Sequence, residues 1–357
     1  MKFMNFFQYC LAACLLQTIF GTKQAARQYW KKFMNFMEEK GFERTHAEPC
    51  LLKRIDNNCT VVICVYVDDC LLTGDRKAID AAIKDIGSGF EKRRLGPIEE
   101  FIGCSLVELP DGNKKLIQPD MIKKIEKEFG ESIIEVKGNK VPMENELTVE
   151  RPTEEDPVIS PDDQKVYRSA VGMLLYLVKH SRPDLSNSVR ELSKDRGVLI
   201  KPDKDQGVIA YCDSDFAGDK GNRRSITGFL IHLFGVPISW KSKQQGGVTL
   251  SSSEAEYYAI SEVSMELKFL KMVMEFLDIE PGRPMKVFVD NIVGEIHLAN
   301  NASSGSRTKH INTRLHFVRE LTQGDDKIID IELVRTEEHQ SDTFTKNTLN
   351  DIIPSGD

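Results

Sequence analysis

Residues 207–241 read GVIAYCDSDFAGDKGNRRSITGFLIHLFGVPISWK in the one-letter code. Three apolar runs rich in β-branched residues lie in this stretch, with turn-forming or charged residues between them. Such runs predict strands, which we place at Val208–Cys212, Thr227–Phe234 and Val236–Lys241. This segment is therefore expected to begin a β-sheet.

The elements after residue 241 alternate between helix and strand. We expect a long helix at Glu254–Leu277, strands at Met285–Val289 and Ile328–Val334, and shorter helices at Val293–Asn300, Asn312–Leu321 and Ser341–Lys346. Three strands, a helix and then alternating elements predict an α/β domain with a mixed five-stranded sheet and helices packed against it. We assign this domain to residues 207–346 and treat residues 347–357 as a tail.

Two aspartates end predicted strands of this sheet. Asp213 follows Val208–Cys212, and Asp290 follows Met285–Val289. If the two strands lie side by side and run parallel, both carboxylates emerge at the sheet edge where α/β folds place ligands. A further acid, Asp342, stands just inside the last predicted helix.

Helical spacing selects one of two glutamates at the start of the long helix. The apolar stripe of this helix includes Ile260, Val263 and Leu267. Glu256 lies four residues before Ile260 and therefore faces the sheet, whereas Glu254 falls off the stripe. The candidate site residues are Asp213, Glu256, Asp290 and Asp342.

Carboxylates that gather in one place need a counter-charge. Burying them unpaired is costly, and a divalent cation removes the conflict. Hard oxygen ligands suit Mg²⁺, with Mn²⁺ as an alternative, and two ions about 4 Å apart would activate water and stabilise the leaving oxygen in phosphodiester cleavage. Each acid alone also has an ordinary interpretation, as a strand-end turn residue, a helix cap or a solvated helix acid. Spacing alone leaves both interpretations open.

Composition excludes several classes of protein. The chain has 357 residues, 40% of them hydrophobic and 29% charged, which suggests two or three globular domains. A formal net charge of −7 argues against a protein that coats nucleic acid by bulk positive charge, although a local basic groove remains compatible. Eight cysteines without a Cys-x-x-Cys spacing disfavour structural zinc and a disulfide scaffold. We expect reduced thiols in an intracellular protein, cytoplasmic or nuclear, whose oligomeric state stays open.

Residues 1–16 are assigned to no domain. They have the outline of a weak signal peptide, but Gln8 and Tyr9 interrupt the apolar run. This interruption favours an ordinary buried helix, or a chance start of the reading frame, over a signal. Since no apolar stretch of the chain reaches the roughly 20 residues that a membrane helix needs, we expect no membrane partner.

The first half of the chain has a pattern of its own. An amphipathic helix is expected at 24–40, and two apolar runs within 61–74 flank the acidic pair Asp68 and Asp69, which predicts a β-hairpin. The acidic, proline-containing stretch 144–165 is typical of a linker, and an apolar helix is expected after it at Val166–Leu177.

Seven ordered motifs in the C-terminal part carry a specific resemblance. They read Tyr211-Cys-Asp-Ser-Asp-Phe-Ala-Gly-Asp219, Arg223-Arg-Ser-Ile-Thr-Gly228, Pro237-Ile-Ser-Trp240, Leu250-Ser-Ser-Ser-Glu-Ala-Glu-Tyr257, Val289-Asp-Asn291, Ser306-Arg-Thr-Lys-His-Ile311 and Asp342-Thr-Phe-Thr-Lys346. Together they closely resemble the ribonuclease H (RNase H) domain of copia-type LTR retrotransposon Pol polyproteins.

This resemblance implies an RNase H-like fold and a nuclease that uses Mg²⁺ to cut the RNA strand of RNA–DNA hybrids. The catalytic and metal-binding acids that it implies are Asp213, Glu256, Asp290 and Asp342. It also implies a surface for the hybrid backbone at Arg307, Lys309, His310 and Arg314, for which a solvated basic loop is the alternative.

Motifs of the first half resemble the reverse transcriptase of the same elements. They include Gly21-Thr-Lys-Gln-Ala-Ala-Arg-Gln-Tyr-Trp30, Val65-Tyr-Val-Asp-Asp-Cys-Leu-Leu-Thr-Gly74 and Leu95-Gly-Pro-Ile-Glu-Glu-Phe-Ile-Gly103. The resemblance assigns 17–145 to a truncated palm and thumb, 146–206 to a shortened connection, and Asp68 and Asp69 to the polymerase metal pair. The family needs a third aspartate on an earlier palm strand, and this chain starts too late to contain it. We therefore expect Asp68 and Asp69 to be vestigial and polymerase activity to be absent.

Two functional hypotheses follow. The first is an enzyme, namely a fragment of a retrotransposon polyprotein whose RNase H domain is a metal-dependent endonuclease acting on RNA–DNA hybrids. The second is a non-catalytic retroelement relic or nucleic-acid-binding module, which the missing polymerase segments and the shortened connection favour.

Overall fold

The computed structural model describes residues 5–12, 23–66, 69–98, 100–133, 160–185, 198–203, 205–218, 223–282, 284–290, 309–324 and 326–335, together with residues 339, 341 and 345. The chain divides into two compact units. Unit 1 comprises Met1–Phe101 with Phe269–Ile279, and unit 2 comprises Ile102–Lys268 with Glu280–Asp357. Among the helices in the described ranges, none is long and apolar enough to cross a membrane.

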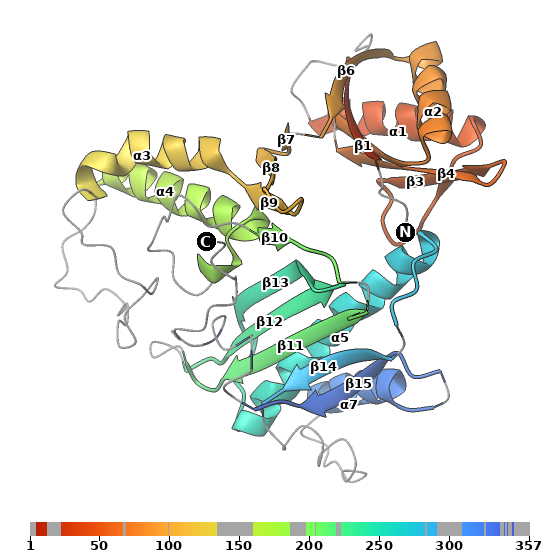
Figure 1. Cartoon of the computed structure of the whole chain (residues 1–357). Helices are drawn as coiled ribbons and strands as arrows, with labels where there is room; N and C mark the ends of the chain where they lie inside the picture. The colour runs from red at the N-terminus through yellow and green to blue at the C-terminus, as the bar shows by residue number, and fades with distance from the viewer. Residues whose placement is uncertain are drawn as a thin grey trace. The chain divides into compact units, whose positions relative to one another are not determined.

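Unit 1 is built on a six-stranded sheet with the order β2-β3-β4-β5-β1-β6 (Figure 1). The strands are β1 (Asn5–Ala12), β2 (Glu43–Arg44), β3 (Leu51–Asp56), β4 (Cys59–Tyr66), β5 (Asp69–Gly74) and β6 (Glu91–Pro97), and the short strand β7 (Glu100–Phe101) follows them in the chain. The helices are α1 (Lys23–Glu39) and α2 (Arg76–Gly89). β4 and β5 pair antiparallel, with Tyr66 opposite Asp69, which confirms the predicted hairpin.

The core of unit 1 explains why α1 forms where the sequence predicts a helix. Phe33 and Met37 lie one helical turn apart, and both are fully buried. They belong to one hydrophobic cluster with Ile63 of β4 and Leu72 of β5. The ring of Phe33 also meets the edge of Phe90, with the centroids 5.2 Å apart. The apolar face of α1 is thus the face that packs against the sheet.

The N-terminal segment differs from the expectation of a buried helix. Asn5–Ala12 forms strand β1, which lies between β5 and β6 and pairs antiparallel with both. Aromatic residues, of which this segment has three, favour strands. A strand in this position also pairs the backbone groups of two neighbouring strands, and that gain outweighs the local helical pattern.

Unit 2 begins with a small antiparallel sheet and a pair of helices. In this sheet, β9 (Lys114–Ile117) pairs antiparallel with β8 (Cys104–Glu108) and with β10 (Val198–Ile200). The helices are α3 (Pro119–Ile133) and α4 (Pro161–His180), and a single 3₁₀ turn, η1 (Pro183–Leu185), follows. Ile122 and Ile125 of α3 form a buried cluster with Met173 and Leu177 of α4.

Three elements of unit 2, α4, η1 and β10, fall in stretches predicted as linker or connection. Helix α4 begins at Pro161, five residues before the predicted start, because Ser160 caps it by accepting a hydrogen bond from the Asp163 N–H at 3.1 Å. Proline in the first helical turn is a further start signal. The linker prediction is therefore wrong for residues 160–165, where acidic composition concealed a helix cap. β10 likewise lies within the predicted connection.

The second sheet of unit 2 has five strands in the order β13-β12-β11-β14-β15 (Figure 1). The strands are β11 (Val208–Asp215), β12 (Ile226–Leu233), β13 (Val236–Gln244), β14 (Met285–Val289) and β15 (Ile329–Leu333). β13, β12 and β11 pair antiparallel, whereas β11, β14 and β15 pair in parallel. This topology confirms the predicted mixed five-stranded α/β sheet.

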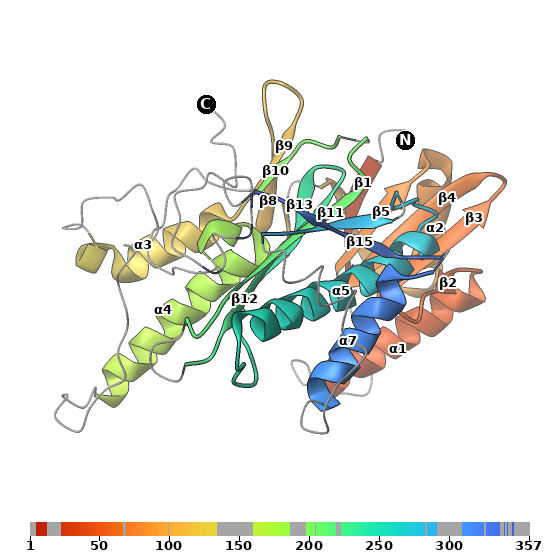
Figure 2. The same ribbon diagram turned by 90° about the horizontal axis from the view of Figure 1, so that it is seen from below.

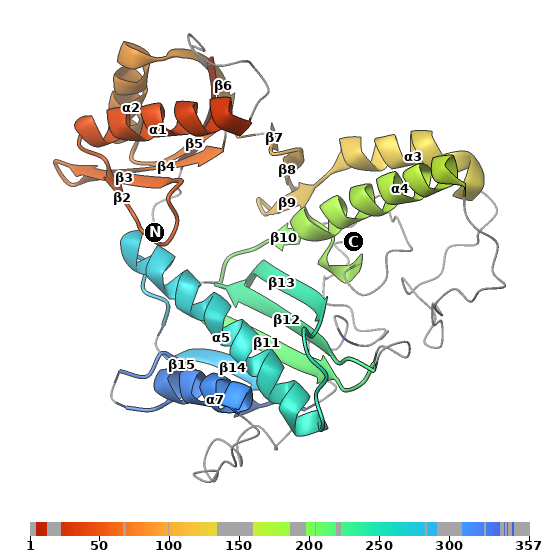
Figure 3. The same cartoon turned by 180° about the vertical axis from the view of Figure 1, so that it is seen from behind.

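Helices α5 (Ser252–Phe276) and α7 (Lys309–Thr322) lie on the same face of this sheet (Figures 2 and 3). The predicted apolar stripe of α5 faces inward, since Ile260, Val263 and Leu267 are fully buried. The helix expected at Val293–Asn300 and most of the one expected at Ser341–Lys346 fall outside the described residues.

Candidate metal centre

β11 and β14 bring two of the predicted acids to one edge of the five-stranded sheet. Tyr211 of β11 is the register partner of Phe288 of β14 in the parallel pair. Asp213 and Asp290 each follow two residues later, and side chains repeat every two residues along a strand, so the two aspartates come level at the same edge. Asp213 is only 1% exposed, whereas Asp290 is partly exposed.

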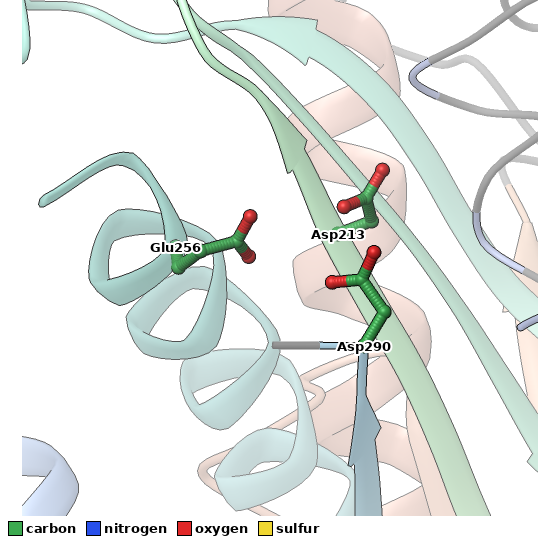
Figure 4. A group of neighbouring side chains, drawn as sticks. All are labelled: Asp213, Glu256 and Asp290. Carbon is green, nitrogen blue, oxygen red and sulfur yellow. The ribbon is translucent and has the colours of Figure 1, made fainter. Parts of the chain in front are cut away.

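α5 contributes a third acid, and its first turn separates the two glutamates of the motif. Glu254 caps the helix: its N–H donates to Ser251 Oγ at 3.2 Å, and its Oε2 accepts from the Leu250 N–H at 2.7 Å. Glu256 is buried, and its side chain extends toward Asp213 and Asp290 (Figure 4). Two glutamates two positions apart therefore have different surroundings, as their helical spacing predicts.

The three acids approach closely enough to share a ligand. Each of Asp213, Glu256 and Asp290 offers a carboxylate oxygen, and these oxygens all lie within 4.8 Å of one another. Two like unit charges about 4 Å apart repel by about 4 kcal/mol at an effective dielectric constant of 20. A donor set made only of carboxylate oxygens fits hard cations such as Mg²⁺ or Mn²⁺. The group is therefore compatible with a divalent-metal site.

Cys212 lies in β11 directly before Asp213, and the three acids affect the pKa of its thiol. Burial raises the pKa of its thiol well above the usual 9, and the negative charges of Glu256, Asp213 and Asp290 raise it further. A thiol binds metals as the thiolate, and this one stays protonated at neutral pH. Cys212 is thus a core residue beside the acids.

Two hydroxyl groups that sequence reasoning missed contact the acids. Ser214 Oγ donates to Glu256 Oε1 at 2.8 Å, and Thr345 Oγ1 donates to Asp213 Oδ2. Strand alternation turns Ser214 away from the face of Asp213 and toward α5, and that signal could have identified it. No local pattern could identify Thr345, which stands 132 positions from its partner.

A buried amide fixes the start of α5. The side-chain Nε2 of Gln245 donates to Thr227 Oγ1 and to the Ala255 carbonyl, both at 3.0 Å. The backbone N–H of Gln245 donates to the carbonyl of Ser225 at 2.8 Å. Because Ala255 directly precedes Glu256, these bonds tie the first turn of α5 to β12 and limit where the Glu256 side chain can lie.

The predicted nucleic-acid surface is described in part. Three residues of this surface have side chains outside the described part of the chain, namely Arg307, Lys309 and His310, and the predicted catalytic residue Asp342 lies outside it too. Arg314 of α7 is described, and its guanidinium lies over the ring of Tyr258, 3.7 Å from the centroid. Its Nη1 also donates to Ser261 Oγ at 3.2 Å. Arg314 therefore rests on α5, two residues beyond Glu256, and stays partly exposed.

The acidic pair of unit 1 has a different environment. Asp68 lies outside the described residues, and Asp69 begins β5, where its register partners are Tyr66 of β4 and Cys10 of β1. Strand β1 reads NFFQYCLA and contains no acidic residue. Asp69 belongs to no group of three potential metal ligands among the described residues.

Comparisons with known proteins identify relatives for both halves of the chain. Residues 11–145 match a family model described as reverse transcriptase (RNA-dependent DNA polymerase). The chain is 31% identical over 363 residues to the retrovirus-related Pol polyprotein from transposon TNT 1-94 of Nicotiana tabacum, a match that covers 93% of this chain and 27% of that protein. It is 28% identical to the corresponding polyprotein from transposon RE2 of Arabidopsis thaliana, with 93% of this chain and 24% of the relative covered. The chain thus spans about a quarter of the length of these curated relatives.

Solved structures give weaker matches. LC11-RNase H1, isolated from compost, is 15% identical with a TM-score of 0.30, over 39% of this chain and 92% of that one. The foamy viral protease-reverse transcriptase in complex with dsDNA is 9% identical with a TM-score of 0.21, over 93% of this chain and 68% of that one. Because these TM-scores are low, we describe the fold of unit 2 from the order and direction of the strands in its five-stranded sheet.

Proposed function

This chain belongs to the family of Pol polyproteins of copia-type retrotransposons, and we propose that its residues 207–346 form an RNase H domain that cuts the RNA strand of RNA–DNA hybrids. The proposed catalytic residues are Asp213, Glu256, Asp290 and Asp342. The proposal concerns this domain alone, because the relatives extend well beyond the matched region.

One observation carries the proposal: carboxylate oxygens from β11, α5 and β14 converge within 4.8 Å. Acids that serve only as turn residues, caps or solvated groups have no reason to meet, and like charges brought together at a buried site repel one another. Divalent cations held there would activate water and stabilise the leaving oxygen of a phosphodiester. Asp213, Glu256 and Asp290 would hold those cations, with Asp342 as the proposed fourth ligand.

The exposure of the acids suggests the direction from which substrate arrives. Asp213 and Glu256 are buried, whereas Asp290 is partly exposed at the edge of the sheet. We therefore propose that the scissile phosphate approaches beside Asp290, while the two buried acids keep fixed positions behind it. A fixed acid with restricted access to water interacts more strongly with charge than a solvated one.

Basic residues of α7 are the proposed contacts for the hybrid backbone. Arg314 is held on α5 by Tyr258 and Ser261, and it brings a positive charge to the helix that carries Glu256. Phosphate contacts of this kind position a duplex without reading its sequence. The proposal extends this role to Arg307, Lys309 and His310.

For residues 17–145 we propose a palm and thumb portion of a reverse transcriptase, without polymerase activity. Asp69 has an acid-free strand as its neighbour, so a third carboxylate does not come from β1. Two-metal chemistry requires carboxylates around both ions. Residues 146–206 remain our proposed connection to the RNase H domain, although α4 and β10 form within that range.

The second candidate is a nucleic-acid-binding module without catalysis. The distance along the chain favours it: η1 ends at Leu185 and β11 begins at Val208, which leaves little chain for a connecting helical segment. A shortened connection would disturb the substrate path while leaving a basic surface that binds the hybrid.

The test is hybrid cleavage by the full chain. An RNA strand with a 5′ fluorophore, annealed to DNA, is incubated with the protein and Mg²⁺. We expect internal cuts in the RNA that EDTA abolishes. Glu256→Gln should lose this activity, because its amide is neutral and a poor metal ligand. Glu254→Gln makes the same chemical change two residues away on the same helix, and it should retain activity.

Equal activity of the two glutamine variants would refute the assignment of Glu256. A folded wild-type chain that binds the hybrid without cutting it would establish the second candidate instead. Circular dichroism of each variant excludes loss of fold as the cause.

A further inference from the structure

We propose that Ser214 and Thr345 are positioning residues, whose hydroxyls orient Glu256 and Asp213 for a divalent cation. This inference rests on the proposed function, since it concerns the same acids. It assigns a role to two neutral side chains that would not themselves bind the metal. We call the two hydroxyls the hydroxyl pair.

The first member links β11 to α5. Ser214 Oγ donates to Glu256 Oε1 at 2.8 Å, and both residues are 7% exposed. A buried glutamate has three rotatable side-chain bonds, and a donor at this distance restricts the orientations that its carboxylate can take. Ser214 follows Asp213 in the chain, so one strand supplies an acid of the site and also fixes the acid that comes from the helix.

The second member links the C-terminal segment to β11. Thr345 is 3% exposed, Asp213 is 1% exposed, and the Thr345 hydroxyl donates to Asp213 Oδ2. A donor on one oxygen leaves the other lone pairs of the carboxylate available for a cation. Thr345 therefore fixes the carboxylate of Asp213 without blocking it.

Two described residues shortly before Thr345, His339 and Ser341, make contacts of their own. Ser341 Oγ lies 3.0 Å from His339 Nδ1, and His339 Nε2 lies 3.3 Å from the carbonyl oxygen of Phe288. Both His339 and Ser341 are fully buried. Phe288 stands in β14, two residues before Asp290. His339, six residues before Thr345, is thus in contact with the strand that precedes the third acid.

The chemistry of the hydroxyl group suits this task. A lysine or arginine would also orient a carboxylate, but its positive charge would compete with the cation. A hydroxyl donates a hydrogen bond and adds no charge, so the attraction of the acids for a divalent ion is kept. Groups that hydrogen-bond to metal ligands in this way typically change metal affinity or activity by about 10- to 100-fold when they are removed.

The experiment measures Mn²⁺ binding to the full chain, with free Mn²⁺ quantified by electron paramagnetic resonance. Ser214→Ala and Thr345→Val each remove one hydroxyl and nearly preserve side-chain volume. We expect each to raise the Kd for Mn²⁺ by about 10- to 100-fold. Thr345→Ser and Ser214→Thr keep a hydroxyl, and they should restore affinity toward that of the wild type.

Two matched controls remove buried or partly buried hydroxyls elsewhere in the unit. Ser264 of α5 donates to the Ile260 carbonyl at 2.7 Å, and Thr322 of α7 donates to the Val318 carbonyl at 3.1 Å. Ser264→Ala and Thr322→Val should leave the Kd for Mn²⁺ unchanged. The rate of hybrid cleavage at increasing Mn²⁺ concentration gives a second readout. The hydroxyl-pair variants should need more Mn²⁺ to reach half of their maximal rate, and at saturating Mn²⁺ they should recover much of the wild-type rate.

The outcomes separate this inference from the proposed function. If the wild type binds Mn²⁺ and Asp213→Asn does not, while Ser214→Ala and Thr345→Val bind as the wild type does, only the positioning role is refuted. If wild type and Asp213→Asn both fail to bind Mn²⁺, the metal centre itself is refuted and the hydroxyl pair with it. Weak binding by Ser264→Ala equal to that of Ser214→Ala would also refute the inference, because any buried hydroxyl would then matter.

Discussion

Asp68 and Asp69 form one acidic group of the chain, and Asp213, Glu256 and Asp290 form another. Among the described residues, only the second group gathers carboxylates from separate elements. In unit 2, Asp213, Glu256 and Asp290 come from two strands and a helix that are distant in sequence. In unit 1, Asp68 and Asp69 are consecutive, and β4 and β1, the two strands beside β5, contain no acid. Acidic residues next to each other in the chain are easy to recognise, but a metal centre depends on what the neighbouring elements contribute.

Geometry explains why the two groups differ. Consecutive residues in a strand point to opposite faces, so a single acid in a strand, such as Asp69 in β5, needs further acids from other elements to complete a binding site. Parallel neighbours such as β11 and β14 end at the same edge, and α5 crosses close enough for Glu256 to join them. The convergent group is the one for which we propose a function.

The largest expected effect tests this contrast directly. Asp290→Asn should lower the rate of hybrid cleavage by more than about 100-fold, because loss of a metal ligand should exceed the effect of losing one of its hydrogen-bond partners. Asp69→Asn should leave the rate unchanged, since we propose no function for that acid. The measurement is the initial rate of RNA cleavage by each full-length variant in Mg²⁺.

Primer extension on an RNA template completes this test. We expect none from the wild type or from either variant. Extension by the wild type that Asp69→Asn abolishes would reverse the contrast, and unit 1 would then be the catalytic one.

The sequence predicts the site best where the periodicity of a strand or helix determines the direction of a side chain. The two-residue repeat of strands and the stripe of α5 predicted that Asp213, Asp290 and Glu256 would meet, and Glu254 was correctly set apart. These conclusions required only that two strands be parallel neighbours. Chain direction and residue spacing carry that information.

The same reasoning failed where partners come from distant parts of the chain. Thr345 contacts Asp213 across 132 positions, and no period links them. Asn5–Ala12 was expected to be helical, yet two open strand edges, those of β5 and β6, make it a strand. The start of α4 at Pro161 could have been predicted from local signals, because Ser160 is a helix cap and proline favours the first helical turn. The acidic composition of this stretch led us to predict a linker instead.

The two units should also differ in their response to acid. His232 of β12 is mostly buried, and burial lowers its pKa from 6.5 to about 4. The unfolded chain takes up this proton near pH 6.5, but the folded chain does so only near pH 4, so unit 2 should lose up to about 3 kcal/mol of stability as the pH falls between these values. The histidine of unit 1, His46, is exposed.

One tryptophan in each unit makes this prediction measurable. Trp30→Phe leaves Trp240 as the fluorescent reporter of unit 2, and urea unfolding is followed from pH 7 to pH 4. His232→Phe should flatten the pH dependence in this background, whereas His316→Gln, which removes an exposed histidine of α7, should not. An unchanged slope in His232→Phe would mean that other groups account for the acid sensitivity.

Metal addition should stabilise one unit and not the other. A ligand at 100 times its Kd that binds only the folded state adds about 2.7 kcal/mol. We expect Mn²⁺ at that excess to stabilise unit 2 by this amount, with the Trp240 signal as reporter. Trp240→Phe leaves Trp30 to report unit 1, which should show no such gain. A gain at Trp30 that Asp69→Asn removes would indicate a second working metal site.

The smallest effect separates two acids within one helix turn. Glu254 accepts from the Leu250 N–H at 2.7 Å near the positive end of the α5 dipole, and Glu254→Gln keeps an acceptor oxygen but removes the charge. The loss of a negative charge at a helix N-terminus typically costs about 0.3–1 kcal/mol. Urea unfolding should detect that decrease in stability, with the Kd for Mn²⁺ unchanged.

Glu256→Gln should have the opposite pair of effects. Removing one of three mutually repelling charges should raise the stability of the metal-free chain, and losing a metal ligand should raise the Kd for Mn²⁺. If the two variants had the same stability and the same Kd for Mn²⁺, the position of a glutamate relative to the sheet would not decide whether it binds the metal.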